Sequence, residues 1–133
     1  MDQVAKEEIR QRAQERCEYC HLPQAHVATP FQIEHVIARQ HGGTDTSSNL
    51  CYSCLRCNLH KGPNLSGIDP KTKKLTRLFN PRRHRWVTHF QWKGAVLIGR
   101  TAVGRTTVHV LAVNDDARVA LRQELIDQGL HSR

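Results

Sequence analysis

Two pairs of cysteines constrain the fold of this chain more than any other feature of its sequence. Cys17 and Cys20 form one Cys-x-x-Cys knuckle, and Cys54 and Cys57 form a second one after the 33 residues from 21 to 53. Two such knuckles supply the four thiolates that a tetrahedral structural zinc requires. The sequence therefore predicts a four-cysteine zinc site, with all four positions filled, that holds the fold together.

The remaining cysteine and a neighbouring histidine leave two alternatives. Cys51 and Cys54 are also spaced as Cys-x-x-Cys. We favour Cys57 as the partner of Cys54, because Cys51 falls where a short strand should bury an apolar side chain, as a free cysteine can. With His21, the first knuckle also spells the attachment signature of c-type haem. We expect no haem, because the N-terminus lacks an export signal and the second knuckle would be left unexplained.

Length and charge narrow the class of protein. The 133 residues suit a single domain, 1–133, and the 38% hydrophobic and 5% aromatic content predicts a modest core that a structural metal would stabilise. The 20 Lys and Arg against 12 Asp and Glu give a net charge of +8, which favours nucleic acid as partner, although a solvated basic surface would look the same. Without a signal segment or an 18-residue apolar run, we expect no membrane contact and a cytoplasmic location.

The hydrophobic pattern predicts an α+β fold. In chain order the predicted elements are a helix over 2–16 capped by Asp2, strands over 31–35 and 49–53, a helix over 55–61, strands over 86–92 and 95–98, a helix over 101–112 capped by Thr101, and a final helix from the Asn114–Asp116 cap to Ile126. Residues 64–74 have the composition of a linker-like loop. This order predicts a zinc-stapled core over 17–62. It also predicts a C-terminal extension over 75–133 that contains a β-hairpin and a helix.

Between the knuckles lie the side chains that hydrolysis of a phosphodiester requires. His35 can take a proton from water, because an unperturbed imidazole is largely neutral at pH 7. Glu34 and Asn58 can offer oxygen ligands to a hard cation such as Mg²⁺, which stabilises charge on the phosphate. Consecutive residues of an ideal strand point to opposite faces, so the strand must end or twist here if Glu34 and His35 are to reach one phosphate.

Five short motifs between residues 17 and 62 carry a family resemblance. Cys-Glu-Tyr-Cys, Ile-Glu-His-Val-Ile, Gly-Gly, Asn-Leu and Cys-Leu-Arg-Cys-Asn-Leu-His-Lys-Gly occur in this order. Together they resemble the HNH endonuclease family, and more narrowly its stand-alone bacterial and phage members with a zinc-stapled ββα-metal (His-Me finger) motif. This resemblance covers about a third of the chain. The residues after it carry a second, weaker resemblance to the C-terminal extensions of bacterial members of the family.

The resemblance implies a metal-dependent DNA endonuclease and a role for each matching residue. His35 matches the general base, and Glu34 matches a ligand of the catalytic Mg²⁺ or Mn²⁺, a position that is more often Asp. Asn49 matches the residue that braces the loop and orients the histidine, and Asn58 matches the last metal ligand, which gives an H-N-N variant. The four knuckle cysteines match the structural zinc ligands. His60 is the alternative to Asn58, or a phosphate contact.

Several basic residues are candidates for phosphate contact. They are Arg56, His60, Lys61, Arg82, Arg83 and Arg85. We expect Trp86 and Trp92 to lie on one face of a strand in the C-terminal core. The alternative function is a zinc-stapled nucleic-acid-binding module without cleavage activity. A module that only binds nucleic acid does not need a carboxylate next to a histidine with an asparagine facing them. The presence of Glu34, His35 and Asn58 together therefore favours the enzyme.

Overall fold

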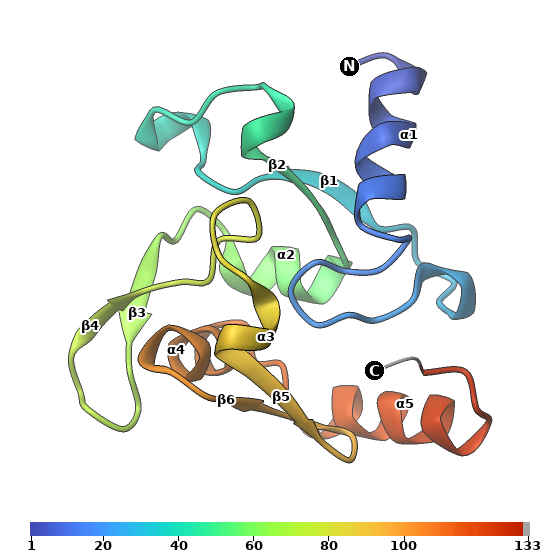
Figure 1. Ribbon diagram of the computed structural model, residues 1–133, viewed down its shortest axis with the longest axis vertical. Helices are drawn as coiled ribbons and strands as arrows, with labels where there is room; N and C mark the ends of the chain where they lie inside the picture. The colour runs from blue at the N-terminus through green and yellow to red at the C-terminus, as the bar shows by residue number, and fades with distance from the viewer. Residues whose placement is uncertain (132–133) are drawn as a thin grey trace.

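The computed structural model describes residues 1–131 and has the mixed helix and strand content that the sequence predicts (Figure 1). Its elements are α1 (Gln3–Arg12), β1 (Gln32–His35), β2 (Leu50–Ser53), α2 (Leu55–Lys61), β3 (Ser66–Ile68), β4 (Leu75–Arg77), α3 (Trp86–His89), β5 (Phe90–Lys93), β6 (Val96–Gly99), α4 (Ala102–Val110) and α5 (Asp116–Asp127), with short 3-10 turns at Gln24–His26, Arg39–His41 and Ser47–Asn49. The strands of the described residues pair into three two-stranded antiparallel sheets, β1–β2, β3–β4 and β5–β6. Within residues 1–131 no helix is long and apolar enough to span a bilayer.

Side-chain caps fix where the helices begin, as the sequence predicts. The Asp2 carboxylate accepts a hydrogen bond from the amide of Ala5 at the start of α1. The Thr101 hydroxyl and the Asp115 carboxylate do the same at the starts of α4 and α5. Each cap satisfies an amide that the first helical turn leaves without a partner. The predicted end of α1 at residue 16 is wrong, because Gln14 and Glu15 adopt a left-handed backbone, φ 56° each, that turns the chain toward the first knuckle.

The segment over residues 64–74, predicted as a loop, contains a strand. β3 pairs with β4 in the register Ser66↔Arg77, Gly67↔Thr76 and Ile68↔Leu75. A close tertiary contact stabilises this short pair: a Cβ at Gly67 would lie 2.5 Å from a methyl of Val110 on α4. The hairpin therefore depends on packing against a helix that begins 25 residues after the hairpin ends, which no local pattern reveals.

The predicted strand over 86–92 is wrong in its first half. Residues Trp86–His89 form the single-turn helix α3, and only Phe90–Lys93 form the strand β5. The Trp86 indole donates a hydrogen bond to the carbonyl of Tyr19, between the cysteines of the first knuckle. Trp86 and Trp92 still meet, with ring centroids 6.0 Å apart, and both pack against the core, although not from one strand face.

The buried core runs through the knuckles. All five cysteines are buried beside Tyr19, Leu50 and Phe79, and the same cluster continues through Phe90, Leu97 and Leu111. In Figure 1, α2 lies near the centre, between the β1–β2 pair and the C-terminal elements. The first knuckle, α2 and the C-terminal elements therefore share one apolar interior, and the knuckles lie within it. The division into a core over 17–62 and an extension over 75–133 stays a prediction.

Candidate active site and metal centre

The four knuckle cysteines converge as the sequence predicts. The Sγ atoms of Cys17, Cys20, Cys54 and Cys57 all lie within 4.8 Å of one another, and those of Cys20 and Cys54 are 3.8 Å apart. Four sulfurs at about 2.3 Å from a tetrahedral zinc would be about 3.8 Å apart. Burial raises the pKa of the Cys17 and Cys57 thiols, and a bound cation would favour their thiolate forms. Both the donor set and its geometry fit zinc.

Cys51 does not join this group. It is fully buried, and its sulfur lies 3.8 Å from the hydroxyl of Tyr19. Burial raises the pKa of its thiol to about 11, so it is a neutral, apolar-like side chain at pH 7. Cys57, and not Cys51, thus lies with Cys54 in the cluster of four sulfurs.

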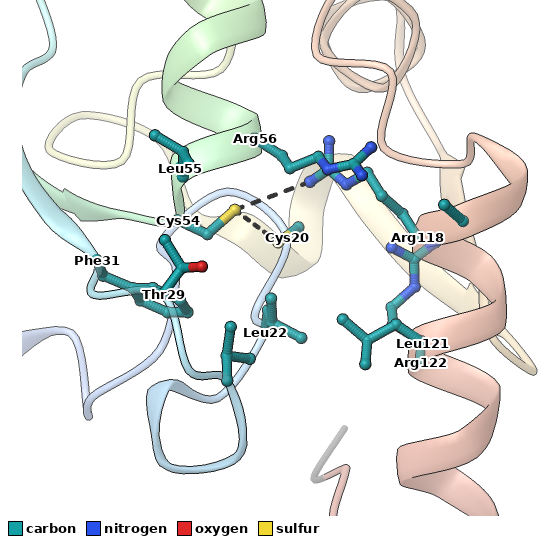
Figure 2. Close-up of a pocket in the computed structure, with 12 residues that line it drawn as sticks. Cys20, Leu22, Thr29, Phe31, Cys54, Leu55, Arg56, Arg118, Leu121 and Arg122 are labelled. Atoms are coloured by element: carbon teal, nitrogen blue, oxygen red, sulfur yellow. Dashed lines mark hydrogen bonds between the residues drawn. The ribbon is translucent and has the colours of Figure 1, made fainter.

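Two buried arginines of α5 complete the surroundings of the cluster, and sequence reasoning missed both. Arg118 donates to the Cys57 sulfur at 2.8 Å and to the carbonyl of Leu111 at 2.7 Å, and Figure 2 shows it reaching from α5 toward Cys54 across a cavity of about 200 Å³. Arg122 donates to the carbonyls of Ala95 and Val113. A tetrathiolate zinc carries a net charge of −2, so a guanidinium against one sulfur offsets part of it.

A second, open cleft of about 460 Å³ lies where β1, the polar loop after it and α2 meet. The side chains of Glu34, His35 and Asn58 all line it. β1 ends at His35, which satisfies the requirement that the strand stop or twist if neighbouring residues are to face one site. The structure thus brings together the acid, the imidazole and the amide that the sequence singled out.

Glu34 and Asn58 are in direct contact across this cleft. The Asn58 Nδ2 donates to Glu34 Oε1 at 3.0 Å and to Gln32 Oε1 at 2.7 Å. A carboxylate and an amide at this separation offer two hard oxygen ligands to a divalent cation once the Asn58 amide rotates to present its oxygen. Gln32 on β1 is a neighbour that sequence reasoning did not identify.

His35 has a carboxylate partner that the sequence did not reveal. Its Nε2 lies 2.7 Å from Oδ1 of Asp45, and Arg39 donates to the same oxygen at 2.8 Å. The Arg39 and His35 contacts lower the pKa of Asp45, which keeps this carboxylate ionised. Asp45 lies within a polar run of the loop over 38–48, with no motif to mark it.

Asn49 holds the two ends of this loop together. Its Oδ1 accepts from the amide of Ile37 at 2.9 Å, and its Nδ2 donates to the carbonyls of Ile37 and Thr44 at 2.9 and 2.8 Å. Asp45 follows Thr44 directly, so these bonds fix the residue that contacts His35. No hydrogen bond joins Asn49 to His35 within the described residues; any orienting effect passes through the loop.

The predicted phosphate contacts occupy different environments. Lys61 is buried, with its ammonium donating to the carbonyl of Val36 at 2.9 Å, and burial lowers its pKa. Arg82 is mostly buried in an ion pair with Glu18. Arg56 is exposed and pairs with Asp115 at 3.3 Å.

The other predicted contacts are exposed. Arg83, Arg85 and His60 have accessible side chains, and His60 is absent from the residues that line the cleft. In this structure Lys61 and Arg82 therefore have structural partners, whereas Arg83, Arg85 and His60 are accessible to a ligand.

The β1–β2 pair, α2 and the four-cysteine cluster together define a ββα core stapled by a zinc-binding site. A family model described as HNH endonuclease matches residues 17–64, the same segment. The chain therefore carries an HNH domain, as the motifs between its knuckles indicate. No match was found among curated proteins or among solved structures.

Proposed function

We infer that this protein is a metal-dependent endonuclease that hydrolyses phosphodiester bonds in DNA. The observation that carries the proposal is the convergence of Glu34, His35 and Asn58 on one open cleft within the HNH segment. The net charge of +8 supports a polyanionic substrate, and the exposed Arg83 and Arg85 are available to phosphates.

The partner of His35 defines how it would act as the general base. When Nε2–H donates to the Asp45 carboxylate, the neutral imidazole leaves the lone pair of Nδ1 available. Nδ1 takes a proton from the attacking water as its oxygen forms a bond to phosphorus, and the bond to the leaving oxygen breaks. Asp45 then stabilises the imidazolium that results, as a carboxylate does when it orients a catalytic histidine.

Glu34 and Asn58 would hold the catalytic Mg²⁺ or Mn²⁺ through one carboxylate and one amide oxygen. When bound, such an ion supplies positive charge that stabilises the phosphate and the departing oxygen. Asn49 contributes indirectly, because it holds the loop that carries Asp45. The four cysteines would bind zinc with no position open to water, so that metal would stabilise the fold and take no part in hydrolysis.

A plasmid assay tests this function. Supercoiled plasmid is incubated with the zinc-loaded protein and Mg²⁺ or Mn²⁺, beside an EDTA control. We expect nicked or linear product from the wild type only with metal, and a rate about 10²- to 10⁴-fold lower for His35→Ala. His41→Ala, an exposed histidine of the same loop, is the matched control and should cut at the wild-type rate.

Two results would count against the proposal. Turnover retained in His35→Ala would remove this residue as the base. A folded, zinc-loaded wild type that binds DNA but cuts with neither metal would instead support a nucleic-acid-binding module without cleavage activity.

A further inference from the structure

The β3–β4 hairpin has one face against the protein and one face in solvent. Gly67 and Thr76, which pair across the hairpin, lie on the side that packs on α4, where a Cβ at Gly67 would meet Val110 and Thr106. Side chains alternate along a strand, so Ile68 and Leu75 point to the opposite side. We call this side, together with the loop lysines Lys71, Lys73 and Lys74 and with Arg77, the outward face.

The outward face combines two exposed aliphatic side chains with four cations. Ile68 and Leu75 are 50% and 75% exposed, and they are direct cross-strand partners, so the two form one apolar patch. Arg77 and the three loop lysines are all exposed. Single exposed aliphatic residues are common, but an exposed aliphatic pair on a hairpin that also carries several exposed cations suits binding in a groove of nucleic acid.

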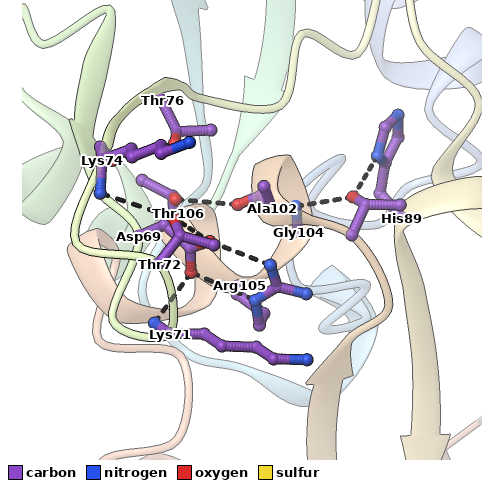
Figure 3. Close-up of polar contacts among 11 residues, drawn as sticks. Asp69, Lys71, Thr72, Lys74, Thr76, His89, Ala102, Gly104, Arg105 and Thr106 are labelled. Atoms are coloured by element: carbon purple, nitrogen blue, oxygen red, sulfur yellow. Dashed lines mark hydrogen bonds and ion pairs between the residues drawn. The ribbon is translucent and has the colours of Figure 1, made fainter.

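The loop that carries the lysines is fixed in place by a buried acid (Figure 3). Asp69 is fully buried and accepts from Nε and an Nη of Arg105 on α4, at 3.1 and 2.9 Å. It also accepts from the amide of Lys71 and the hydroxyl of Thr72. A loop held in this way loses little conformational entropy when its side chains bind a ligand.

No carboxylate neutralises the cations of this face. Asp69 is the only acidic residue between positions 64 and 77, and its carboxylate forms an ion pair with Arg105. Across residues 1–131, no ion pair involves Lys71, Lys73, Lys74 or Arg77. The outward face therefore presents four positive charges to a partner, which complements a row of phosphates.

The hairpin also begins at the edge of the candidate active site. Gly62 and Pro63 line the cleft, and β3 starts three residues later at Ser66. A strand of three residues extends about 10 Å, a length that spans roughly three phosphates of one DNA strand at about 3.4 Å each along the axis. The hairpin that carries the outward face is thus joined directly to the cleft, and the proposal is that one duplex contacts both.

We propose that the outward face of the β3–β4 hairpin is a second contact for duplex DNA, with Lys71, Lys73, Lys74 and Arg77 on the phosphates and the Ile68–Leu75 pair against the minor groove. This rests on the proposed function, in which DNA is the substrate. The contact extends the footprint of the enzyme beyond the cleft without adding readout of base sequence, because lysines on phosphates set affinity and register only.

Binding measured apart from cutting tests the proposal. The probe is a fluorescent 30-base-pair duplex, titrated with zinc-loaded His35→Ala protein without added Mg²⁺ or Mn²⁺ at several NaCl concentrations. Lys71→Gln with Lys74→Gln should weaken binding at least 10-fold and reduce the slope of log affinity against log salt by about 1.8, because each lysine that neutralises a phosphate adds about 0.9 to that slope. Ile68→Ser with Leu75→Ser should weaken binding about 5-fold and leave the slope unchanged.

The matched controls remove the same chemistry from other surfaces. Lys6→Gln with Lys93→Gln removes two exposed charges from α1 and β5, and Val4→Ser removes an exposed aliphatic side chain from α1. Both should leave the affinity and the salt slope within error of the unsubstituted protein. Thermal unfolding of every variant establishes that it is folded.

The outcomes separate this proposal from the proposed function. A wild type that neither binds nor cuts duplex DNA overturns both. A wild type that cuts plasmid, with hairpin variants that keep the affinity and the salt slope, overturns the hairpin contact alone. Loss of binding to vesicles of 30% phosphatidylserine in the hairpin variants, with DNA binding unchanged, would assign the outward face to a membrane surface instead.

Discussion

Replacing Asn49 by alanine tests whether this side chain braces the loop that positions Asp45. The substitution removes three hydrogen bonds, one from the amide of Ile37 and two to the carbonyls of Ile37 and Thr44. Each is worth about 1 kcal/mol net, which gives about 3 kcal/mol in total. Water can reach part of the vacated site, because Thr44 is exposed, so we expect the free energy of unfolding to fall by about 2–3 kcal/mol.

The assay is urea unfolding at a fixed zinc concentration, combined with plasmid cutting at a temperature where the variant is folded. Since the loop would no longer hold Asp45 against His35, we expect cutting to slow by roughly 10- to 100-fold. Asn64→Ala, an exposed asparagine outside the loop, is the control and should change stability by less than about 0.5 kcal/mol.

A third variant identifies which bonds matter. Asn49→Asp keeps an acceptor for the amide of Ile37 but directs a carboxylate oxygen at two carbonyls, so it should destabilise at least as much as alanine does. A stability loss below about 0.5 kcal/mol for Asn49→Ala would refute the hydrogen-bond reasoning. Normal cutting by a destabilised but folded Asn49→Ala would show that the brace supports the fold and not the site.

Three further predictions concern the glycine turn, the zinc surroundings and the β3–β4 loop. Gly43→Ala should slow plasmid cutting far more than Gly42→Ala, because a Cβ at Gly43 would lie 1.7 Å from the Ile37 carbonyl oxygen. A Cβ at Gly42 would meet open space, and its only cost is the backbone strain of φ 87°, about 1–2 kcal/mol. Equal effects of the two substitutions on cutting would contradict this prediction. Arg118→Met should lower zinc affinity about 10- to 100-fold in competition with a chelator, because it removes the guanidinium on the Cys57 sulfur, and unchanged affinity would show that this contact is not needed. Arg105 lowers the pKa of Asp69. This ionised acid therefore stabilises the fold at a pH above its unfolded pKa of about 4, and that contribution is lost as the pH falls toward the folded pKa. Urea unfolding between pH 5 and 3 should show a steeper loss of stability for the wild type than for Asp69→Asn, and parallel slopes would refute the assignment.

Short-range features of this chain could be predicted from sequence because their causes are local. The caps at Asp2 and Thr101 act on amides three residues later, and α2 ends at Lys61 just before Gly62, as predicted. The pairing of the two knuckles was also predictable, since zinc requires four soft ligands and only one arrangement left Cys51 in a strand.

The features that were missed depend on contacts between distant segments. β3 is stabilised against α4, so the loop-like composition of residues 64–74 did not reveal it. The indole of Trp86 bonds to Tyr19, 67 residues earlier, so local alternation predicted a strand where α3 forms. Asp45 and Arg118 act through partners 10 and 61 residues away, with no spacing rule to connect them. The sequence thus identified which residues meet in the cleft, and Asn49 as the brace of the loop, but not the carboxylate that contacts His35.

The contact between Arg118 and Cys57 also has a consequence for the order of events during synthesis. Arg118 is added 61 residues after Cys57, an interval of about 3–12 s at elongation rates of about 5–20 residues per second. During this interval all four cysteines and the cleft residues exist without the guanidinium beside the cluster. A nascent chain can therefore assemble its thiols before it can fully balance their charge, and we expect firm retention of the metal to begin only when α5 docks.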